Sequence, residues 1–293
     1  MKKIMTLFML GVFSLMTLCS CNIGGEENTE SKNFEVNKEI TVISREEGAG
    51  LRGVVAQLFD FLDTKADNAA DLTFSGASIK ESADDIRTAV ANDTYAIGYL
   101  PLTAVTDNVK TLKIDGVEPT ADNVRDGDYK FKHKISAVVK QDVGAAAQDF
   151  INYILSTEGQ KILSDDGYIS FGDSGSFTSK NPEGTIKISV AASAEPAVNK
   201  LSKAYGKINK NLKIEITKAN AKNALDSVKD KDNIAILTRT LSNNEKKSFN
   251  ETTICEDGIA VIVNRENSLN NITAGQVKSI YKGETKKWSD IIK

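Results

Sequence analysis

The sequence predicts an α/β fold with mostly parallel sheets. Short apolar runs typical of buried strands alternate with segments in which apolar residues recur at helical spacing. Strands that alternate with helices in this way form βα units with parallel neighbouring strands. The pattern runs from residue 40 to about 165, stops in a stretch at 171–184 rich in Gly, Ser, Asn and Pro, and restarts at 186. A chain of 293 residues is long enough for two lobes.

The first part of the pattern lies before the break at 171–184. In the helix predicted at 49–62, five apolar residues share one face at helical spacing: Val54, Val55, Leu58, Phe59 and Leu62. A turn is expected at 118–120, where Glu, Pro and Thr follow one another. In this part we predict strands at 40–44, 95–100, 109–117 and 129–140, and helices at 49–62, 79–91, 145–155 and 158–163.

After the break the same alternation returns. Pro196 falls in the first turn of a predicted helix, where its missing N–H group costs little. Thr273 and Gln276 have the spacing of a capping box, which marks the start of another helix. The apolar strand at 254–264 is long enough to cross between two lobes. In this part we predict strands at 186–191, 212–217, 234–238 and 254–264, and helices at 196–208, 221–228 and 276–281.

The N-terminus has the pattern of a lipoprotein signal peptide. Two lysines precede an apolar run at 4–18 that is too short for a comfortable membrane span. The segment LCSC at 18–21 resembles a bacterial lipobox, so we expect residues 1–21 to be the signal segment, with Cys21 carrying a palmitate-type lipid anchor. An ordinary cleaved signal peptide is the alternative. Residues 22–39 are polar and are expected to form a flexible tether, with the protein held on the extracytoplasmic face of a cell membrane, at a Gram-positive surface or in a periplasm.

Charge and residue content argue against several classes of protein. The net charge of −3 and the pI near 5.5 argue against a nucleic-acid-binding protein, which would carry a basic stripe. His133 is the only histidine, and we expect it to be a solvated strand residue. Cys255 is expected to be a small buried residue rather than a nucleophile. Without a metal-ligand cluster or an activated nucleophile, the sequence predicts neither an enzyme nor a cofactor.

The segment at 40–52, ITVISREEGAGLR, has the layout of an anion cradle. It reads as a buried strand, a charged turn with glycines and a helix start, so backbone N–H groups at the helix N-terminus would face an oxyanion. A second block, DGIAVIVNRENSLNNITAGQVKSIYKGETKKW, occupies 257–288. Together with AIGY at 96–99, LKIDGVEPT at 112–120 and EGQ at 158–160, these blocks resemble the phosphate-binding proteins of bacterial phosphate ABC transporters.

The order of the blocks differs from that of the family. There the DGIAVIVN block precedes the SREEG block, whereas here it follows, so the chain resembles a circularly permuted member over nearly all of residues 40–293. The resemblance implies a two-lobed, periplasmic-binding-protein-like (type II) fold with a ligand cleft between the lobes. Lobe A would comprise residues 40–130 and 256–293, and lobe B residues 131–255, including a linker at 172–185. Such a permutation is reasonable if the family's chain ends lie close together on the surface.

The resemblance also implies which residues line the cleft. Arg45 would give a charge-assisted contact to an oxyanion, and Glu47 would pair with Arg45 and hold it in place. A surface Arg–Glu pair of little energetic value is the alternative. The remaining expected contacts come from the loops that match the family's GSGT, GST, GSG and SR segments: Gly48, Ala49, Gly50, Leu51, Ser193, Ala194, Asn220, Thr238 and Arg239.

Several hydroxyl groups of the family pattern are missing, notably at Ala49 and Leu51. A lost hydrogen bond to a charged group costs roughly 1.5–3 kcal/mol, so losing three would weaken binding by several orders of magnitude unless other groups replace them. Three interpretations stay open: a remodelled phosphate site, a site for another anion or a larger ligand, and a degenerate surface protein acting as sensor, adhesin or structural element. The resemblance implies a monomer that hands phosphate, or a related oxyanion, to ABC permease subunits.

Overall fold

The computed structural model describes residues 34–63, 70–172 and 174–292. The main strands are β1 (Thr41–Arg45), β4 (Ser78–Lys80), β5 (Ala96–Pro101), β6 (Lys110–Thr111), β8 (Lys132–Lys140), β9 (Ile169–Ser170), β10 (Gly184–Val190), β11 (Leu212–Lys218), β12 (Asn233–Leu237) and β13 (Phe249–Val263). Two small pairs are formed by β2 (Leu62–Asp63) with β3 (Ala70–Asp71), and by β7 (Lys113–Ile114) with β14 (Asn271–Ile272). The helices are α1 (Gly50–Leu58), α2 (Ala83–Asn92), α3 (Ala121–Asp126), α4 (Ala145–Leu155), α5 (Thr157–Asp165), α6 (Glu195–Ile208), α7 (Ala221–Asp226) and α8 (Ala274–Tyr281), with 3-10 turns η1 (Leu102–Ala104), η2 (Glu245–Lys247) and η3 (Trp288–Asp290).

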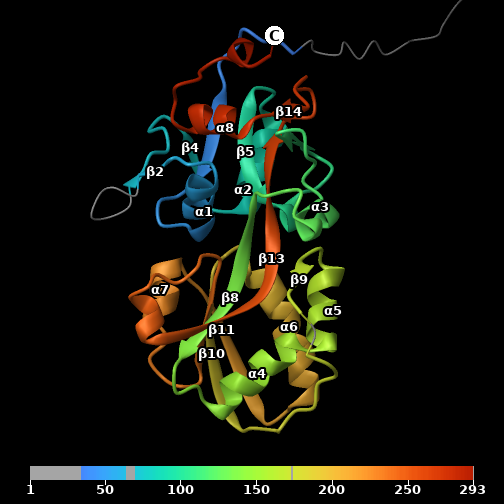
Figure 1. The fold of residues 1–293 in the computed structure, drawn as a ribbon, viewed down its shortest axis with the longest axis vertical. Helices are drawn as coiled ribbons and strands as arrows, with labels where there is room; N and C mark the ends of the chain where they lie inside the picture. Colours follow the sequence, from blue (N-terminus) through green and yellow to red (C-terminus); the bar gives the residue numbers. More distant parts are fainter. Residues whose placement is uncertain (1–33, 64–69, 173, 293) are drawn as a thin grey trace, which may run out of the picture. The chain divides into compact units, whose positions relative to one another are not determined.

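In the described part of the chain, the main strands form one ten-stranded sheet with the order β11-β10-β12-β8-β13-β5-β1-β4, while β6 and β9 pair with β13 (Figure 1). The pairs β11–β10, β10–β12, β5–β1 and β1–β4 are parallel. The pairs β12–β8, β8–β13 and β13–β5 are antiparallel. The α/β class is as predicted, but the sheet is mixed, because β8 and β13 run against their neighbours in the middle.

The long strand β13 joins two halves of this sheet. Its residues 249–258 pair with β8, and its residues 259–263 pair with β5 (Figure 1). Strands β11, β10, β12 and β8 therefore lie on one side of this crossing, and β5, β1 and β4 on the other. As expected for the strand predicted at 254–264, β13 crosses between them, although it starts earlier, at Phe249.

Each half has helices on both faces. In β5, Ile97 and Tyr99 face the core formed with α1 and α8, whereas Leu100 faces the core formed with α2. Every residue of β5 is buried, as expected for a strand covered on both faces. Helix α2 approaches this strand at Gly98, where an added Cβ would lie 2.9 Å from Ile86 Cγ2. A larger residue there would push α2 away from the sheet.

In the other half, alternation along β8 and β12 separates two further cores. Ile135 and Ile234 point to the core that holds α4, α5 and α6, and Val138 and Leu237 point to the core that holds α7. Helix α6 buries one stripe at helical spacing, namely Ala197, Val198, Leu201 and Tyr205. The apolar side chains therefore fix both the register of the strands and the buried faces of the helices.

Several predicted boundaries change for local reasons. The helix expected at 49–62 ends at Leu58, because Asp60 has a φ of +57° and Phe61 donates its N–H back to the carbonyl of Ala56. The helix expected at 79–91 begins only at Ala83, since residues 78–80 pair with β1 as β4 and Ser82 caps the helix. Helix α4 and the Thr273–Gln276 capping box are confirmed.

Residues near the two ends of the described chain lie side by side. Ile40 donates its N–H to the carbonyl of Lys286, and Trp288 and Ser289 donate to carbonyls in 36–38. Phe34 packs edge-on against Trp288, with ring centroids 5.7 Å apart. The flexible tether predicted at 22–39 is therefore wrong for its last six residues, because residues 34–39 pack on the fold. The signal segment and Cys21 lie outside the described residues.

Two expectations about single residues can be compared with the structure. Cys255 is a buried free cysteine, as predicted. His133 is buried rather than solvated, with neither ring nitrogen hydrogen-bonded in the described part of the chain. Burial lowers the pKa of His133 to about 4, so the ring is neutral at physiological pH. No helix among residues 34–63, 70–172 and 174–292 has the length and apolar character needed to cross a membrane.

Candidate functional site

A cavity of about 230 Å³, called here the cleft, lies where loops from both halves of the sheet meet. Its lining follows the C-terminal ends of parallel strands, which is where ligands bind in open α/β sheets. The loops after β1 and β4 contribute from one half, and those after β10, β11 and β12 contribute from the other. The lining residues are Arg45, Glu46, Ala49, Gly50, Leu51, Glu81, Ala191, Ala192, Ser193, Lys218, Ala219, Asn220, Ala221 and Thr238.

The turn between β1 and α1 presents a free helix N-terminus to the cleft. Gly48 has a φ of +82°, a left-handed conformation that favours glycine and lets the chain reverse into the helix. No side chain caps α1, and its first turn holds no acidic residue. Its first intrahelical hydrogen bond runs from Gly53 N–H to the Ala49 carbonyl, so the N–H groups of Gly50, Leu51 and Arg52 have no helical acceptor. These donors and the positive end of the helix favour an anion.

Tyr99 fixes the end of β1 next to this turn. Its hydroxyl oxygen accepts the Arg45 backbone N–H at 3.1 Å and shares a 2.9 Å hydrogen bond with Ser44 Oγ. Burial raises the pKa of Tyr99, which keeps the phenol protonated at neutral pH. On the other side, Tyr281 donates its hydroxyl to the Ile43 carbonyl at 3.2 Å. The strand that carries Arg45 is thus held by two buried phenols.

Arg45 is buried with its guanidinium partly bound. Nε and Nη2 donate to the two carboxylate oxygens of Glu46, each at 2.8 Å, and Nη2 also donates to the Glu81 carbonyl at 2.8 Å. Only 5% of the Arg45 side chain is exposed, and Nη1 donates to no residue in the described part of the chain. Nη1 therefore keeps two N–H donors for a ligand in the cleft.

The partner predicted for Arg45 was wrong. Glu47 is exposed and does not line the cleft, whereas Glu46 makes the ion pair. Glu46 directly follows Arg45, and its carboxylate accepts from both Nε and Nη2 of that residue. Arg52, which the sequence did not single out, donates from Nη1 to the Arg45 carbonyl at 2.9 Å and forms an ion pair with Asp71.

Thr238 lies at the end of β12 and faces α1. Its hydroxyl is buried and has no hydrogen-bond partner among the described residues. The Oγ1 atom is so close to Gly50 that an added Cβ there would lie 2.6 Å away. A buried hydroxyl without a partner costs about 1–3 kcal/mol, which a bound acceptor or donor would recover. The pairing of Thr238 with Gly50 brings the two halves of the sheet together at the cleft.

The far side of the cleft is formed by the loops before α6 and α7. Ser193 lines the cleft, but Ala194 does not, because it is the fully buried N-cap residue of α6. Asn220 lines the cleft while its side-chain oxygen accepts the Asn223 N–H at 2.8 Å, which caps α7. Lys218 forms a 2.8 Å ion pair with Glu195, the first residue of α6.

Arg239, expected to contact the anion, does not line the cleft. Its Nη1 and Nη2 atoms donate to the two carboxylate oxygens of Glu245 at 2.9 and 2.7 Å. The hydrogen bond from Arg239 is the main cause that lowers the pKa of Glu245 to about 2, with the Ser242 N–H adding to it. Arg239 is therefore a structural partner of η2 in this structure.

The structure thus brings together most of the predicted residues. Seven of them line the cleft: Arg45, Ala49, Gly50, Leu51, Ser193, Asn220 and Thr238. Glu47, Gly48, Ala194 and Arg239 do not. The residues that sequence reasoning missed mostly lie within three residues of a strand end, a position that the α/β pattern marks as ligand-facing. They are Glu46, Glu81, Ala191 and Lys218, whereas the other lining residues, Ala192, Ala219 and Ala221, belong to the loops that match the family's GST and GSG segments.

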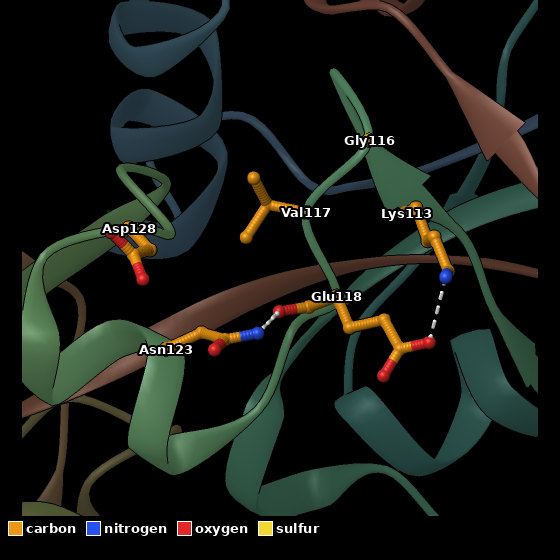
Figure 2. A pocket seen from close by; sticks show the side chains of 6 residues that line it. All are labelled: Lys113, Gly116, Val117, Glu118, Asn123 and Asp128. Atoms are coloured by element: carbon orange, nitrogen blue, oxygen red, sulfur yellow. Dashed lines mark hydrogen bonds and ion pairs between the residues drawn. The ribbon is translucent and has the colours of Figure 1, made fainter.

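A second hollow, of about 440 Å³, is lined by Lys113, Gly116, Val117, Glu118, Asn123 and Asp128 (Figure 2). Three of its polar residues, Lys113, Glu118 and Asn123, already contact one another. Lys113 Nζ pairs with the Glu118 carboxylate at 2.9 Å, and Asn123 Nδ2 donates to the Glu118 carbonyl at 2.9 Å (Figure 2). The hollow presents no unpartnered buried hydroxyl like that of Thr238. The cleft is therefore the better candidate for a binding site.

Comparison with known proteins places the chain in a family. The sequence matches the PBP superfamily domain over residues 28–158 and 175–292. It is 34% identical over 300 residues to the phosphate-binding protein PstS 2 of Streptococcus agalactiae, with 100% of both chains covered. It is 31% identical over 139 residues to the phosphate-binding protein PstS of Bacillus subtilis, with 47% of this chain and 43% of that protein covered.

A solved structure supports the same assignment. The crystal structure of a phosphate-binding protein of a phosphate ABC transporter from Streptococcus pneumoniae TIGR4 matches with a TM-score of 0.76 and 32% identity, covering 86% of this chain and 99% of that one. The α/β fold with its mixed sheet is thus that of a known binding protein. The chain belongs to the PBP superfamily, among the PstS-like phosphate-binding proteins.

Proposed function

We propose that this protein captures phosphate or a related oxyanion in the cleft and delivers it to an ABC importer. The observation that carries the proposal is the buried, unpartnered hydroxyl of Thr238, which faces the uncapped N-terminus of α1. A ligand in the cleft would give this hydroxyl a hydrogen bond. The names of the relatives, which are phosphate-binding proteins, support phosphate as the default ligand.

The binding roles follow from the donors around the cleft. The first N–H groups of α1, the free Nη1 of Arg45 and the hydroxyls of Thr238 and Ser193 would donate to the oxyanion. Glu46 would hold the guanidinium in place, which is the role first expected of Glu47. We propose no catalytic step, since the relatives are named as binding proteins.

A hinged clamp would enclose this ligand. We propose lobes of residues 40–130 with 256–293, and of residues 131–255, because the buried cores divide near these boundaries. The linker at 172–185 would belong to the second lobe, and its segment 174–183 forms no helix or strand. Since the cleft takes its lining from both proposed lobes, closing them would exclude water from the anion.

The circularly permuted order also remains a proposal, and two observations support it. The described chain ends lie side by side, through hydrogen bonds between 36–40 and 286–289, as a permutation requires. The alignment with the Bacillus subtilis protein covers only 43% of that protein, whereas the Streptococcus agalactiae protein is covered completely. When two chains carry the same two segments in opposite order, an alignment that runs in sequence order can match only one of the segments.

Location and partners complete the proposal. Cys21 would carry the lipid anchor and hold a monomer on the extracytoplasmic face of the membrane. ABC permease subunits would receive the ligand, in keeping with the ABC transporter named for the pneumococcal protein. One observation favours a second candidate, a non-transport surface protein on the same scaffold: apolar Ala49 and Leu51 line the cleft where hydroxyls were expected.

Uptake of radiolabelled phosphate separates the two candidates. A strain lacking the gene would be complemented with the wild-type chain or with Arg45→Ala, at matched amounts of protein. The transport proposal expects the wild type to restore uptake and Arg45→Ala not to restore it. Uptake that is the same with and without the gene would sink the transport proposal and leave the surface protein.

A further inference from the structure

Arg45 is held by its backbone as well as by its side chain. Strand β1 pairs with β5 only through Thr41 and Val42, so this pairing does not reach Arg45. Side chains take over there, because the Tyr99 hydroxyl accepts the Arg45 N–H and Arg52 Nη1 donates to the Arg45 carbonyl at 2.9 Å. Both main-chain polar groups of the residue that offers its guanidinium to the cleft are thus bound by side chains.

Arg52 makes its bond from a fixed position. It lies in the first turn of α1, and its Nε donates to the Asp71 carboxylate in β3. The other carboxylate oxygen of Asp71 accepts the Thr73 N–H at 2.8 Å and the Thr73 hydroxyl at 2.5 Å. The side chains of Arg52 and Asp71 are 14% and 20% exposed. Because two of its nitrogens are bound to different partners, the planar guanidinium of Arg52 has one orientation.

Arg52 does not line the cleft, and its charge is balanced by Asp71. A balanced pair attracts an anion weakly at a distance, so a role of Arg52 in binding runs through Arg45. The peptide between Arg45 and Glu46 is planar, and the bond to its carbonyl fixes that plane. The same peptide joins the two residues whose side chains form an ion pair in the cleft. Without Arg52, the peptide is free to rotate, and a carbonyl turned towards the cleft would repel an oxyanion.

We infer that Arg52 is a positioning residue for the oxyanion donor Arg45, and that Asp71 keeps Arg52 in place for this role. Arg52 binds the Arg45 carbonyl from outside the lining of the cleft and fixes the start of the turn that carries Glu46. This inference rests on the proposed function of the cleft as an oxyanion site. It adds a chain of contacts outside the cleft on which the affinity for the anion depends.

The sign of the effect at Asp71 separates positioning from charge. Asp71→Asn removes one negative charge, so an electrostatic effect alone would strengthen the binding of an anion. An amide has a single acceptor oxygen, which cannot serve both Arg52 and Thr73 at the two positions of the carboxylate. With Arg52 loosened, phosphate binding should weaken at least about fivefold. Calorimetric titration of the full chain with inorganic phosphate measures this change.

Two variants of Arg52 provide a second arm. Arg52→Gln should weaken phosphate binding at least about tenfold. Adding Asp71→Asn should then weaken it by less than about twofold more, because both changes break the same chain of contacts. Arg52→Lys keeps the charge but loses the fork of donors, so it should stay at least about fivefold weaker than the wild type. Wild-type affinity in Arg52→Lys would show that only the charge matters and would overturn the inference.

Asp60→Asn is the matched control. Asp60 pairs with Lys278 just past the other end of α1, and its φ of +57° is one that Asn tolerates. This change removes the same charge as Asp71→Asn without touching Arg52, so phosphate affinity should not fall. A fall as large as that of Asp71→Asn would overturn the inference.

The failures are distinguishable once thermal melting without ligand has shown which variants fold. Asp71→Asn that binds phosphate as tightly as the wild type, or more tightly, would overturn the inference and leave the proposed function standing. No phosphate binding by the folded wild type would overturn both. If Arg52→Gln does not fold, Asp71→Asn and Arg52→Lys decide the question.

Discussion

The hydroxyl oxygen of Thr238 lies 2.6 Å from the point that a Cβ atom on Gly50 would occupy. Gly50 begins α1, and Thr238 directly follows β12 in the other half of the sheet. Because no side chain fits between them, the hydroxyl and the helix N-terminus face the same small volume. The two walls of the cleft are therefore in close contact at this point.

Gly50→Ala should therefore abolish oxyanion binding while the chain stays folded. The added Cβ displaces Thr238 and separates the walls of the cleft. Gly53→Ala is the matched control in the same helix, because no heavy atom lies within 4 Å of its Cβ position. It should bind as the wild type does and gain up to about 1 kcal/mol in the free energy of unfolding. Calorimetry and thermal melting check both, and equal binding by the two variants would contradict the geometry.

Thr238→Val removes the buried hydroxyl and keeps the shape of the side chain. The free energy of unfolding without ligand should not fall, because the oxygen has no partner to lose in the described structure. Anion affinity should fall by about 1.5–3 kcal/mol, roughly tenfold to a hundredfold, through loss of one hydrogen bond to a charged ligand. Chemical denaturation and titration measure the two quantities. A clear loss of stability with unchanged affinity would show that the hydroxyl is structural.

Arg239→Gln distinguishes the observed site from the one that the resemblance implies. Arg239 lies outside the cleft lining and binds Glu245 through two hydrogen bonds. Anion affinity should change by less than about twofold. The free energy of unfolding should fall less on acidification than in the wild type, because the pKa of Glu245, now about 2, returns toward its usual value. A loss of affinity of tenfold or more would mean that Arg239 reaches the ligand.

Asp257 predicts a pH dependence at the crossing of β13. Its carboxylate is buried and accepts the Thr103 hydroxyl at 2.6 Å, and its strand neighbour in β8 is the buried His133. Burial raises the pKa of Asp257 from 3.8 to about 7. The folded chain therefore holds this proton where the unfolded chain has lost it, so rising pH between about 4 and 7 costs stability.

Asp257→Asn should remove that cost. The variant's advantage in free energy of unfolding should grow by about 1.4 kcal/mol per pH unit between about pH 4 and pH 7, and then level off. Comparing variant and wild type at each pH cancels the separate titration of His133, whose pKa is about 4. Urea denaturation across this range measures the difference. A difference that does not vary with pH would mean that Asp257 ionises normally.

Elements with a clear apolar pattern could be predicted from the sequence, and elements without one could not. Helix α4 has one apolar face over eleven residues and was predicted with its observed ends. Helix α3 buries only Val124, so it shows no period, and its cap at Thr120 read as part of a turn. Strand β4 spans three residues and exists because β1 pairs with it. Such elements are fixed by tertiary neighbours rather than by local pattern.

The sequence predicted which loops form the site, but not which side chains contact one another there. The cradle at 40–52 and the loops at 192–194 and 219–221 do meet at the cleft. The sequence could not show that Glu46, one residue before Glu47, would be the partner of Arg45, because adjacent carboxylates in a turn give no periodic signal of which one faces the guanidinium. Likewise, the carboxylate that holds Arg239 lies in a turn without apolar pattern.

Phosphate titration of the full chain and of Arg45→Ala by calorimetry tests the central claim most directly, namely that the cleft is an oxyanion site built on α1, Arg45 and Thr238. We predict one binding site in the wild type. Arg45→Ala should lose about 3 kcal/mol of binding free energy, more than a hundredfold in affinity, with its fold retained. Equal phosphate binding by the two folded proteins, or no binding by the wild type, would contradict the claim.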